Sequence, residues 1–420
     1  MKLSSFGQKL GEDAGINSLM DDLGEAMASG GDVVMMGGGN PGHLPEVTDR
    51  LQAIMKELVD DPEQFRRLTG VYDPPQGEKQ FIASLVELLN REYDWGLTTE
   101  NVGLTNGSQS AFFMLFNMLA GEHPDGSHKH ILLPLAPEYI GYGDAGLTPG
   151  LFHAVRPEIE ELGDNQFKYR VDFSQLEITE DTAAICVSRP TNPTGNVLTD
   201  GEMLGLEELA REHDIPLIVD GAYGSPFPDL MYTEASPRWT PQHILCLSLS
   251  KLGIPAARTG IVIADKPVIR ALSGVNAIMN LATGSFGAML AEPLVRSGEI
   301  ISMSRDLVQP VYQRKMEAAV AAFREAMGDE CPWRGHKPEG AMFLWLWFPD
   351  LPISSLELYK RLKARGVLVV SGHYFFPGLP DEGWRHQHEC LRVTYSQDAA
   401  DVARGLQAIA EEVKRAWAQG

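Results

Sequence analysis

The stretch 183–196 reads AAICVSRPTNPTGN, and it sets the pattern for the middle of the chain. Its apolar part, 183–187, ends directly in polar residues and a turn rich in Pro and Gly. Four other short apolar runs behave alike, at 131–135, 216–219, 244–249 and 260–264. Runs this short that are apolar on both faces are typical of buried parallel strands. Helical patterns such as 201–213 lie between them, so we predict an α/β fold with a mostly parallel central sheet covered by helices.

The pattern changes after about residue 300. A long helical stretch at 302–327 precedes the apolar run AMFLWLWF at 341–348, a helical pattern at 356–366 and two strand-like runs at 367–372 and 390–395. The last residues, 402–417, carry apolar side chains at spacings of three and four, as an amphipathic helix does. We therefore expect a second, smaller α+β unit with its boundary near residue 300.

Charge and composition exclude several classes of protein. The 420 residues contain 35 Lys and Arg against 57 Asp and Glu, a net charge of −22, which disfavours binding to nucleic acids or anionic membranes. The longest apolar run is too short to cross a bilayer, and the first residues lack the apolar core of a signal peptide. Four scattered cysteines indicate neither a disulfide framework nor a metal site. We expect a cytoplasmic protein.

Polar residues collect where the predicted middle strands end. Asn192 follows the first strand, Asp220 ends PLIVD with Tyr223 three residues on, and Lys251 and Arg258 follow ILCLSLS. Each residue alone has an ordinary explanation as a turn, a helix cap or a solvated surface group. Ligands bind at the carboxyl ends of strands in open parallel sheets, however, and all five side chains belong to that edge. The set therefore predicts one shared crevice.

A further turn fits the same crevice. The strand-like VGLT at 102–105 leads through NGSQ (106–109) into an apolar helix predicted at 110–120. A Gly-Ser step at a helix start presents free N–H groups and a hydroxyl to an anion, and the helix dipole adds to the attraction. A helix cap without a ligand is the alternative. With Ser248 and Arg258 expected nearby, a phosphate site is the better interpretation.

Taken together, Asn192-Pro-Thr-Gly, Asp220-x-x-Tyr223, Ser248-x-x-Lys251, Arg258 and a late Arg392 resemble the signature of the fold-type I pyridoxal-phosphate aminotransferases. The resemblance covers nearly the whole chain, through GGGNP (37–41), LTNGSQSAFF (104–113), PLAPEYIGY (134–142), HKPEGAMFLWLWF (336–348) and LKARGV (362–367). It implies pyridoxal 5′-phosphate as cofactor. It also implies a large cofactor-binding domain at 49–300, a small C-terminal domain at 301–420, and an N-terminal segment, 1–48, that joins the small domain and covers the active site.

The resemblance assigns roles to the residues around the cofactor ring. Lys251 would form a Schiff base with the cofactor aldehyde and, once displaced, act as the base that moves a proton at the substrate α-carbon. Asp220 would keep the pyridine nitrogen protonated, so that the ring accepts electrons from that carbon. Tyr223 and Asn192 would hydrogen-bond the ring hydroxyl, and Tyr139 would stack on the ring face. A packed core tyrosine is the alternative for Tyr139.

Further residues are assigned to the phosphate and to the substrate. Ser108, Ser248 and Arg258 would bind the phosphate, with Gly107 and Gln109 in the same cofactor-binding turn. Tyr72 resembles a tyrosine that reaches the phosphate from the neighbouring subunit, which implies a homodimer. Arg392 would bind the substrate α-carboxylate through its two-donor fork. Gly39, beside Gly38, would belong to a loop that folds over the substrate, whose side chain would meet some of Ile16, Leu19 and Tyr139.

The long stretches resemble most closely the branch of this family that transfers an amino group between valine and pyruvate. The resemblance thus implies an aliphatic amino acid, valine or alanine, and a 2-oxo acid, pyruvate or 2-oxoisovalerate. A kynurenine-type aminotransferase or a cysteine-conjugate β-lyase would share every motif and remains the alternative. A transcriptional regulator of this fold is disfavoured, because 1–39 shows no helix-turn-helix pattern. We predict no metal, because ordinary loop and core positions explain His373, His386, His388 and Cys390.

Overall fold

A computed structural model describes residues 2–11, 24, 33–381 and 383–419. Its larger sheet has eight strands in the order β2-β11-β10-β9-β8-β4-β3, with β5 paired to β4. These strands are β2 (Val102–Thr105), β3 (Gly121–Glu122), β4 (His128–Leu133), β5 (Phe152–Ala154), β8 (Thr182–Ser188), β9 (Leu217–Asp220), β10 (His243–Ser248) and β11 (Gly260–Ile263). The pairs among β4, β5, β8, β9 and β10 are parallel, which confirms the predicted fold class.

Strand β11 contradicts one expectation, because 260–264 was predicted as a parallel strand. It runs antiparallel to both β10 and β2. The link from β10 holds only two 3₁₀ turns, Ser250–Leu252 and Pro255–Ala257, whereas a parallel crossover needs a dozen or more residues and usually a helix. The reversal has a useful consequence: the beginning of β11, just after Arg258, lies at the edge where β10 ends.

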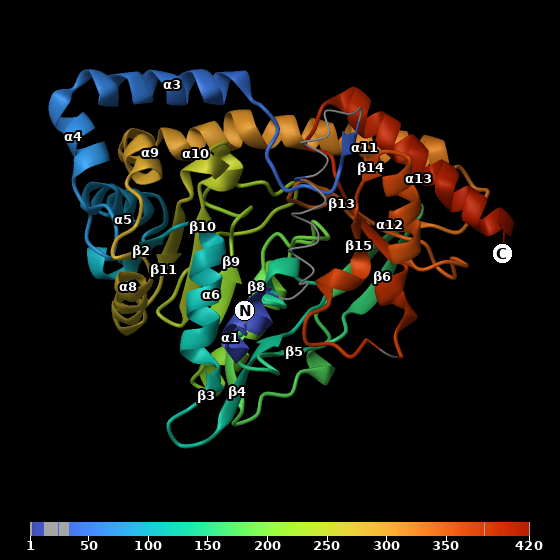
Figure 1. Cartoon of the computed structure of the whole chain (residues 1–420), viewed down its shortest axis with the longest axis horizontal. Coiled ribbons are helices and arrows are strands. Elements are labelled where there is room, and N and C mark those ends of the chain that lie inside the picture. Colours follow the sequence, from blue (N-terminus) through green and yellow to red (C-terminus); the bar gives the residue numbers. More distant parts are fainter. Residues whose placement is uncertain (1, 12–23, 25–32, 382, 420) are drawn as a thin grey trace.

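Helices cover both faces of this sheet (Figure 1). The helices that pack on its strands are α5 (Lys79–Tyr93), α6 (Ser108–Leu119), α7 (Asp200–Glu212) and α8 (Lys266–Asn280). Helix α9 (Phe286–Ser297) packs on α5, and α3 (Pro45–Asp60) and α4 (Pro62–Gly70) lie farther out, along the upper left border of Figure 1. Helix α6 lies in front of the strands in Figure 1 and buries Phe112, Leu115 and Phe116 against them. It begins two residues earlier than predicted because Gly107, with φ of 90°, caps it directly after β2.

The second sheet has six strands in the order β15-β16-β13-β12-β7-β6. They are β6 (Glu158–Gly163), β7 (Gln166–Arg170), β12 (Arg334–His336), β13 (Phe343–Trp347), β15 (Val370–Ser371) and β16 (Cys390–Thr394), and α11 (Gln309–Met327), α12 (Ser355–Ala364) and α13 (Ala399–Gln419) lie beside them (Figure 1). The β6–β7 hairpin comes from the middle of the sequence, yet β7 pairs with β12. The division of the chain at residues 48 and 300 stays a prediction.

Two predicted elements of this part are interrupted. The run 367–372 forms two short strands: β14 (Val367–Leu368) pairs with β1 (Val34–Met35), whereas β15 pairs with β16, so the chain changes partners at Val369. The long helix begins earlier than predicted, as α10 (Glu299–Met303), and widens into a π turn at Ser304–Val308 before α11. The Ser304 hydroxyl donates to the carbonyl of Ile300 there, a bond that competes with regular helix geometry.

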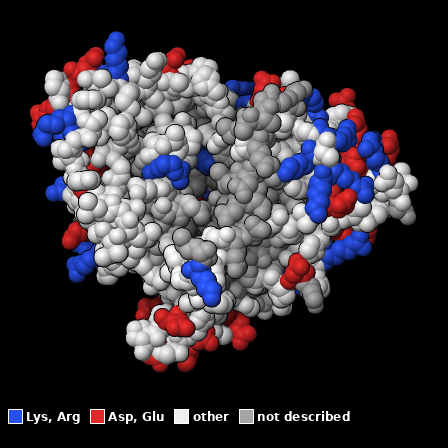
Figure 2. Space-filling view, in the orientation of Figure 1, with Lys and Arg blue, Asp and Glu red and all other residues white. Residues whose placement is uncertain are grey.

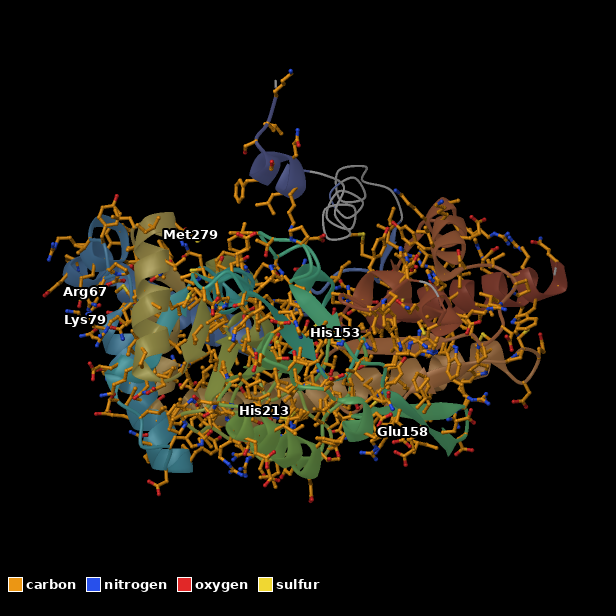
Figure 3. The ribbon with its side chains drawn as sticks, turned by 90° about the horizontal axis from the view of Figure 1, so that it is seen from below. Arg67, Lys79, His153, Glu158, His213 and Met279 are labelled. Carbon is orange, nitrogen blue, oxygen red and sulfur yellow. The ribbon has the colours of Figure 1, made fainter. Side chains whose placement is uncertain are left out.

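The N-terminal helix α1 (Ser5–Gly11) lies apart from these layers, as the view from below shows (Figure 3). None of its residues is buried. Among the described residues, no helix has both the length and the apolar character that crossing a bilayer would require.

Candidate active site

One cavity of about 210 Å³ lies at the carboxyl edge of the larger sheet. A hollow is visible near the centre of the face in Figure 2, with Lys or Arg side chains beside it and Asp and Glu side chains mostly toward the margins. The cavity brings together eleven of the predicted site residues: Gly39, Ser108, Gln109, Tyr139, Asn192, Asp220, Tyr223, Ser248, Lys251, Arg258 and Arg392. They come from both sheets and from loops far apart in the sequence.

Asp220 lies on the cavity wall at the end of β9. In the paired strands it stands level with Ser188 of β8 and Cys246 of β10. Its Oδ2 accepts a hydrogen bond from the Tyr142 hydroxyl at 2.7 Å, and its Oδ1 accepts one from the backbone N–H of Ala222 at 2.9 Å. Burial raises its pKa, and no ion pair to it occurs among the described residues. A buried carboxylate with neutral donors only suits a cationic ligand.

Lys251 enters the cavity from the short turn after β10. Its Nζ donates to the carbonyl of Gly39 at 2.6 Å and lies 5.2 Å from the centre of the Tyr223 ring. Burial lowers the pKa of Lys251 to about 8, and the positive charges of Arg392 and Arg258 act in the same direction. The neutral form, which attacks a carbonyl carbon, is therefore far more populated near neutral pH than for a solvated lysine.

The anion-binding end of the cavity depends on glycine. A Cβ at Gly107 would lie 2.3 Å from Nη2 of Arg258, and one at Gly260 would lie 2.6 Å from the backbone nitrogen of Ser108. The guanidinium can thus approach the first turn of α6 because Gly107 lacks a side chain, and the start of β11 can pass close to this turn because Gly260 lacks one. Helix N–H groups, the Ser108 and Ser248 side chains and one guanidinium meet here, a set of groups suited to a phosphate.

Arg392, on β16, reaches the cavity from the second sheet. Its Nη1 donates to Oδ1 of Asn192 at 2.8 Å and its Nη2 to the carbonyl of Gly37 at 2.6 Å, while its buried Nε has no partner among the described residues. The guanidinium carbon lies 4.4 Å from the ring centre of Phe343 and 5.0 Å from that of Phe375. Burial lowers the pKa of Arg392 to about 10. The group stays charged and keeps donor capacity for a carboxylate.

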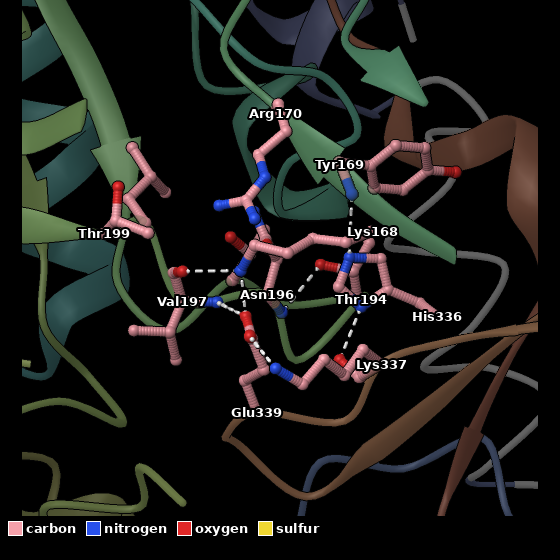
Figure 4. Close-up of polar contacts among 12 residues, drawn as sticks. Lys168, Tyr169, Arg170, Thr194, Asn196, Val197, Thr199, His336, Lys337 and Glu339 are labelled. Carbon is pink, nitrogen blue, oxygen red and sulfur yellow. Dashed lines mark hydrogen bonds and ion pairs between the residues drawn. The ribbon is translucent and has the colours of Figure 1, made fainter. Parts of the chain in front are cut away.

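An ion-pair cluster around a buried Lys168–Glu339 pair holds the loop that carries Asn192 (Figure 4). Lys168 of β7 pairs with Oε2 of Glu339 and also donates to the carbonyl of Val197 at 3.0 Å. The same Oε2 accepts from the N–H of Val197 at 3.2 Å, and Lys337 pairs with Oε1 at 3.0 Å. We call Lys168, Lys337, Glu339 and the backbone of Val197 the Lys168 cluster. It fixes the loop to the second sheet.

Four predicted residues lie outside the cavity or outside the description. Tyr72 is 81% exposed on the surface and does not line the cavity. Gly107 is absent from the lining but packs against Arg258, which does line it. Ile16 and Leu19 lie outside the described residues, so their place in a substrate pocket stays a prediction.

Sequence reasoning did not assign several residues that surround the site. The cavity lining also includes Phe112, Ile140, Ser188, Pro190, Ala222 and Ser250. Tyr142 and Glu138 lie behind this lining and contact Asp220 and Ser188 respectively. Ser188 ends its strand one residue past the predicted run, so the strand-end rule that singled out Asp220 could have found it. Nothing local distinguishes Tyr142 and Glu138 from core residues.

Residues 32–409 match the family model described as aminotransferase class I and II. The chain belongs to that family. It is 46% identical over 419 residues to the valine–pyruvate aminotransferase of Escherichia coli K12, with complete coverage of both chains. A crystal structure of an amino-acid aminotransferase from Psychrobacter arcticum, described as putative, matches with a TM-score of 0.97, 47% identity and complete coverage of both chains. Valine–pyruvate aminotransferase from Salmonella typhimurium matches with a TM-score of 0.88 and 46% identity, over 97% of this chain and 100% of that one.

Enzymes of this aminotransferase family use pyridoxal 5′-phosphate. When bound, this cofactor takes up the electrons released at the α-carbon of an amino acid. Three independent features of the cavity suit pyridoxal 5′-phosphate. Asp220 is a buried carboxylate that forms no ion pair with any described residue, Lys251 is a buried amine with a lowered pKa, and Gly107 leaves room for Arg258 at the helix end. The protein is a pyridoxal-phosphate-dependent transaminase.

Proposed function

We propose that this aminotransferase transfers the amino group between valine or alanine and a 2-oxo acid, pyruvate or 2-oxoisovalerate. One observation carries the proposal: the amine of Lys251, the carboxylate of Asp220 and the fork of Arg392 line the same 210 Å³ cavity. The printed names of the Escherichia coli and Salmonella relatives, both 46% identical to this chain, support the choice of substrates.

The proposal gives each residue near the cofactor ring a task. Lys251 holds the cofactor covalently and later moves the proton at the substrate α-carbon. Asp220 faces the ring nitrogen and favours its protonated form, because a cation there supplies the missing partner of the buried carboxylate. Tyr223 and Asn192 donate to the ring hydroxyl, and Tyr139 covers the ring face. Their shared cavity supports these assignments.

The remaining residues bind the two charged ends of the reactants. Ser108, Ser248 and Arg258 take the cofactor phosphate, with Gln109 in the same turn. Arg392 takes the substrate α-carboxylate beside Asn192 and the loop of Gly39. The buried Nε of Arg392, which has no partner among the described residues, and the two parallel N–H donors of its guanidinium support this role.

The cations of the cavity support a preference for monocarboxylic amino acids. Among the described lining residues, the only arginines are Arg258 and Arg392, and the proposal uses one for the phosphate and the other for the α-carboxylate. A second substrate carboxylate would then enter without a cation, at a desolvation cost. The apolar lining residues Phe112, Ile140 and Ala222 suit an aliphatic side chain better.

A half-reaction tests this proposal. Valine added to the holoenzyme without an acceptor should convert the bound cofactor from its aldehyde to its amine form, seen as a change in visible absorbance. Pyruvate should then reverse the change and yield one alanine per site. Aspartate and glutamate serve as dicarboxylic controls and should react more slowly. Rapid conversion by a dicarboxylate with no response to valine would contradict the substrate assignment. Release of pyruvate from a cysteine conjugate without an acceptor would instead identify a β-lyase.

The proposal includes a homodimer with shared active sites. Large apolar side chains are exposed on two neighbouring segments: Val71, Tyr72, Ile278, Met279, Leu281 and Phe286. Ile278 is 89% exposed, and Met279 is labelled near the end of α8 in Figure 3. The Asn276 side chain donates to the carbonyl of Pro75 at 2.7 Å, which joins the two segments. An apolar surface of this kind suits a protein–protein interface.

This surface also adjoins the phosphate end of the cavity. The N–H of Gly284 donates to Oδ1 of Asn106 at 3.1 Å, directly before Gly107 and Ser108. A second copy seated on the surface would bring its Tyr72 toward the first copy's phosphate site. Sedimentation should therefore give a dimer. A mixture of Lys251→Ala and Tyr72→Ala chains should be more active than either variant alone, because one site per hybrid dimer is intact. A monomer at assay concentration, or no gain on mixing, would contradict shared sites.

The proposal places the enzyme in the cytoplasm. Cys186, Cys246 and Cys390 are buried free thiols, a state that a reducing compartment maintains. Cell fractionation with an antibody against the protein tests this location directly.

A further inference from the structure

Arg392 is a buried cation with no anion beside it in the described part of the chain. It is 2% exposed, and the only ionisable groups that raise its pKa are the hydroxyls of Tyr223 and Tyr139. Only one other described arginine is buried, Arg189, and its Nη2 lies 2.6 Å from Oδ1 of Asp200. Arg392 donates to two neutral oxygens instead. A buried charge without a counter-ion needs another source of compensation.

Two aromatic rings supply part of this compensation. The guanidinium carbon of Arg392 lies over the ring of Phe343, 4.4 Å from its centre, and over the ring of Phe375, 5.0 Å from its centre. The face of an aromatic ring carries partial negative charge, and it attracts a cation most strongly where water is excluded. Both phenylalanines are completely buried. Their rings therefore stabilise the positive charge without placing an acid beside it.

The register of the second sheet explains the contact with Phe343. Arg392 of β16 stands opposite Trp345 of β13, and Thr394 of β16 stands opposite Phe343. Side chains of paired residues, and of residues two positions along a strand, point to the same face of a sheet. Phe343 is thus the diagonal neighbour of Arg392, a position from which aromatic and long side chains reach each other. The alternation in FLWLW (343–347) therefore places a ring against the guanidinium.

Phe375 reaches the guanidinium from a different element. It ends the 3₁₀ turn Gly372–Phe375, which directly follows β15. Its ring packs edge-on against Trp345 at 5.7 Å between centroids, and its carbonyl accepts the N–H of Glu138 at 2.8 Å. Neither this ring nor that of Phe343 is part of the cavity lining, whereas Arg392 is. A bound molecule would thus contact the guanidinium and not the two rings that hold it.

We propose that Phe343 and Phe375 are positioning residues whose ring faces hold the Arg392 guanidinium dry and in one orientation, so that its charge stays available to the substrate α-carboxylate. An acid in place of either ring would pair with Arg392 and compete with the substrate. Water in place of a ring would let the guanidinium turn and would have to be displaced on binding. The inference rests on the role proposed for Arg392.

Two half-substrates separate carboxylate binding from amine binding. Isovalerate is valine without its amino group, and isobutylamine is valine without its carboxyl group, so only isovalerate needs Arg392. In Phe375→Leu holoenzyme the dissociation constant of isovalerate, measured as inhibition of valine conversion, should rise roughly three- to thirtyfold, as expected for the loss of a desolvated cation–π contact. The dissociation constant of isobutylamine, measured by cofactor absorbance, should not change. KM for valine should rise like the isovalerate constant, with kcat nearly kept.

Two further variants control for packing and folding. Phe348→Leu also removes a buried ring next to β13, but that ring packs against Phe323 at 6.5 Å between centroids, so both dissociation constants should stay at wild-type values. Phe343→Leu tests the other ring and keeps the inference falsifiable where Phe375→Leu does not fold. Because the Phe343 ring also lies 5.8 Å from that of Tyr223, its readout is the ratio of the two dissociation constants, which should shift against isovalerate.

The outcomes distinguish this inference from the proposed function. Equal weakening of isovalerate and isobutylamine in the Phe343 and Phe375 variants would overturn the inference, and so would wild-type constants in both variants or the same selective loss in Phe348→Leu. Failure of valine to convert the cofactor would refute the proposed substrate alone, and the ratio is then measured with the acid and amine halves of the amino acid that does convert it. A wild-type holoenzyme that no carboxylic acid inhibits would overturn the inference itself.

Discussion

Two sets of charges contact the loop that carries Asn192, the Lys168 cluster around the buried Lys168–Glu339 pair and the charges of the cavity, and they are built in opposite ways. In the Lys168 cluster every charge has a partner: Lys168 and Lys337 both pair with Glu339 (Figure 4). In the cavity the charges meet neutral groups instead. Lys251 donates to a carbonyl, and Asp220 accepts from a phenol and an amide.

The difference separates a structural site from a binding site. Burial lowers the pKa of both Lys168 and Lys251, but Glu339 opposes this effect at Lys168 from hydrogen-bond distance. Uncompensated buried charges destabilise a fold, whereas a well-bonded buried pair can hold two segments in a fixed arrangement. In the cavity Lys251 and Asp220 attract each other only at a distance, without an ion pair, so a ligand can still compensate both charges, and the cluster keeps the loop in place for that ligand.

Removal of Lys251 tests the contrast between the cavity and the Lys168 cluster with the largest expected effect. Lys251→Ala should lower the rate of transamination by roughly 10⁴-fold or more, because the nucleophile and the proton-transfer group are one side chain. The cofactor-free variant should unfold at the same temperature as the cofactor-free wild type or higher, because an uncompensated buried amine is gone. Steady-state assays and thermal melts measure the two effects. Full activity would remove Lys251 from its role, and a large fall in melting temperature would contradict the contrast with Lys168.

The corresponding test in the Lys168 cluster removes its carboxylate. Glu339→Leu should destabilise the protein by about 3–5 kcal/mol, because Lys168 then remains buried without a carboxylate. The double variant Lys168→Met with Glu339→Leu should recover much of this loss. Lys266→Ala is the matched control, since its pair with Glu100 is exposed to solvent and should contribute much less to stability. Equal effects of the buried and exposed substitutions in denaturant titrations would contradict a structural role for the cluster.

A smaller expected effect is the pH dependence of the free energy of unfolding. In the cofactor-free protein the pKa of Lys251 is about 8 in the folded state against an ordinary value of 10.5, so between these values the unfolded chain binds more protons. The free energy of unfolding of the cofactor-free protein should therefore rise with pH between these two pKa values, by about 3 kcal/mol at most. The difference from Lys251→Met isolates this contribution, because other groups titrate in both proteins. Identical pH profiles of unfolding for the two would show that Lys251 is not a destabilised buried amine.

The sequence is informative where local rules suffice. Short apolar runs followed by polar residues predict β8, β9 and β10, and the strand-end rule correctly places Asn192, Asp220 and Lys251 in one crevice. The direction of β11 was missed, because an apolar run looks the same in either orientation.

Long-range pairing explains what the sequence could not indicate. Lys168 lies in KYR, which has the pattern of a solvated strand, and its partner Glu339 is 171 residues away. Glu138 and Tyr142 likewise become part of the site only through Ser188 and Asp220, which belong to other strands. Such networks depend on the assembled sheets rather than on any local pattern.

The most direct test asks which lysine bonds to the cofactor. Holoenzyme reduced with borohydride and digested should yield a single pyridoxyl-labelled peptide, and mass spectrometry should place the label on Lys251, the buried amine that forms no ion pair within the described part of the chain. A label on Lys168, on any other lysine, or on none at all would contradict the account.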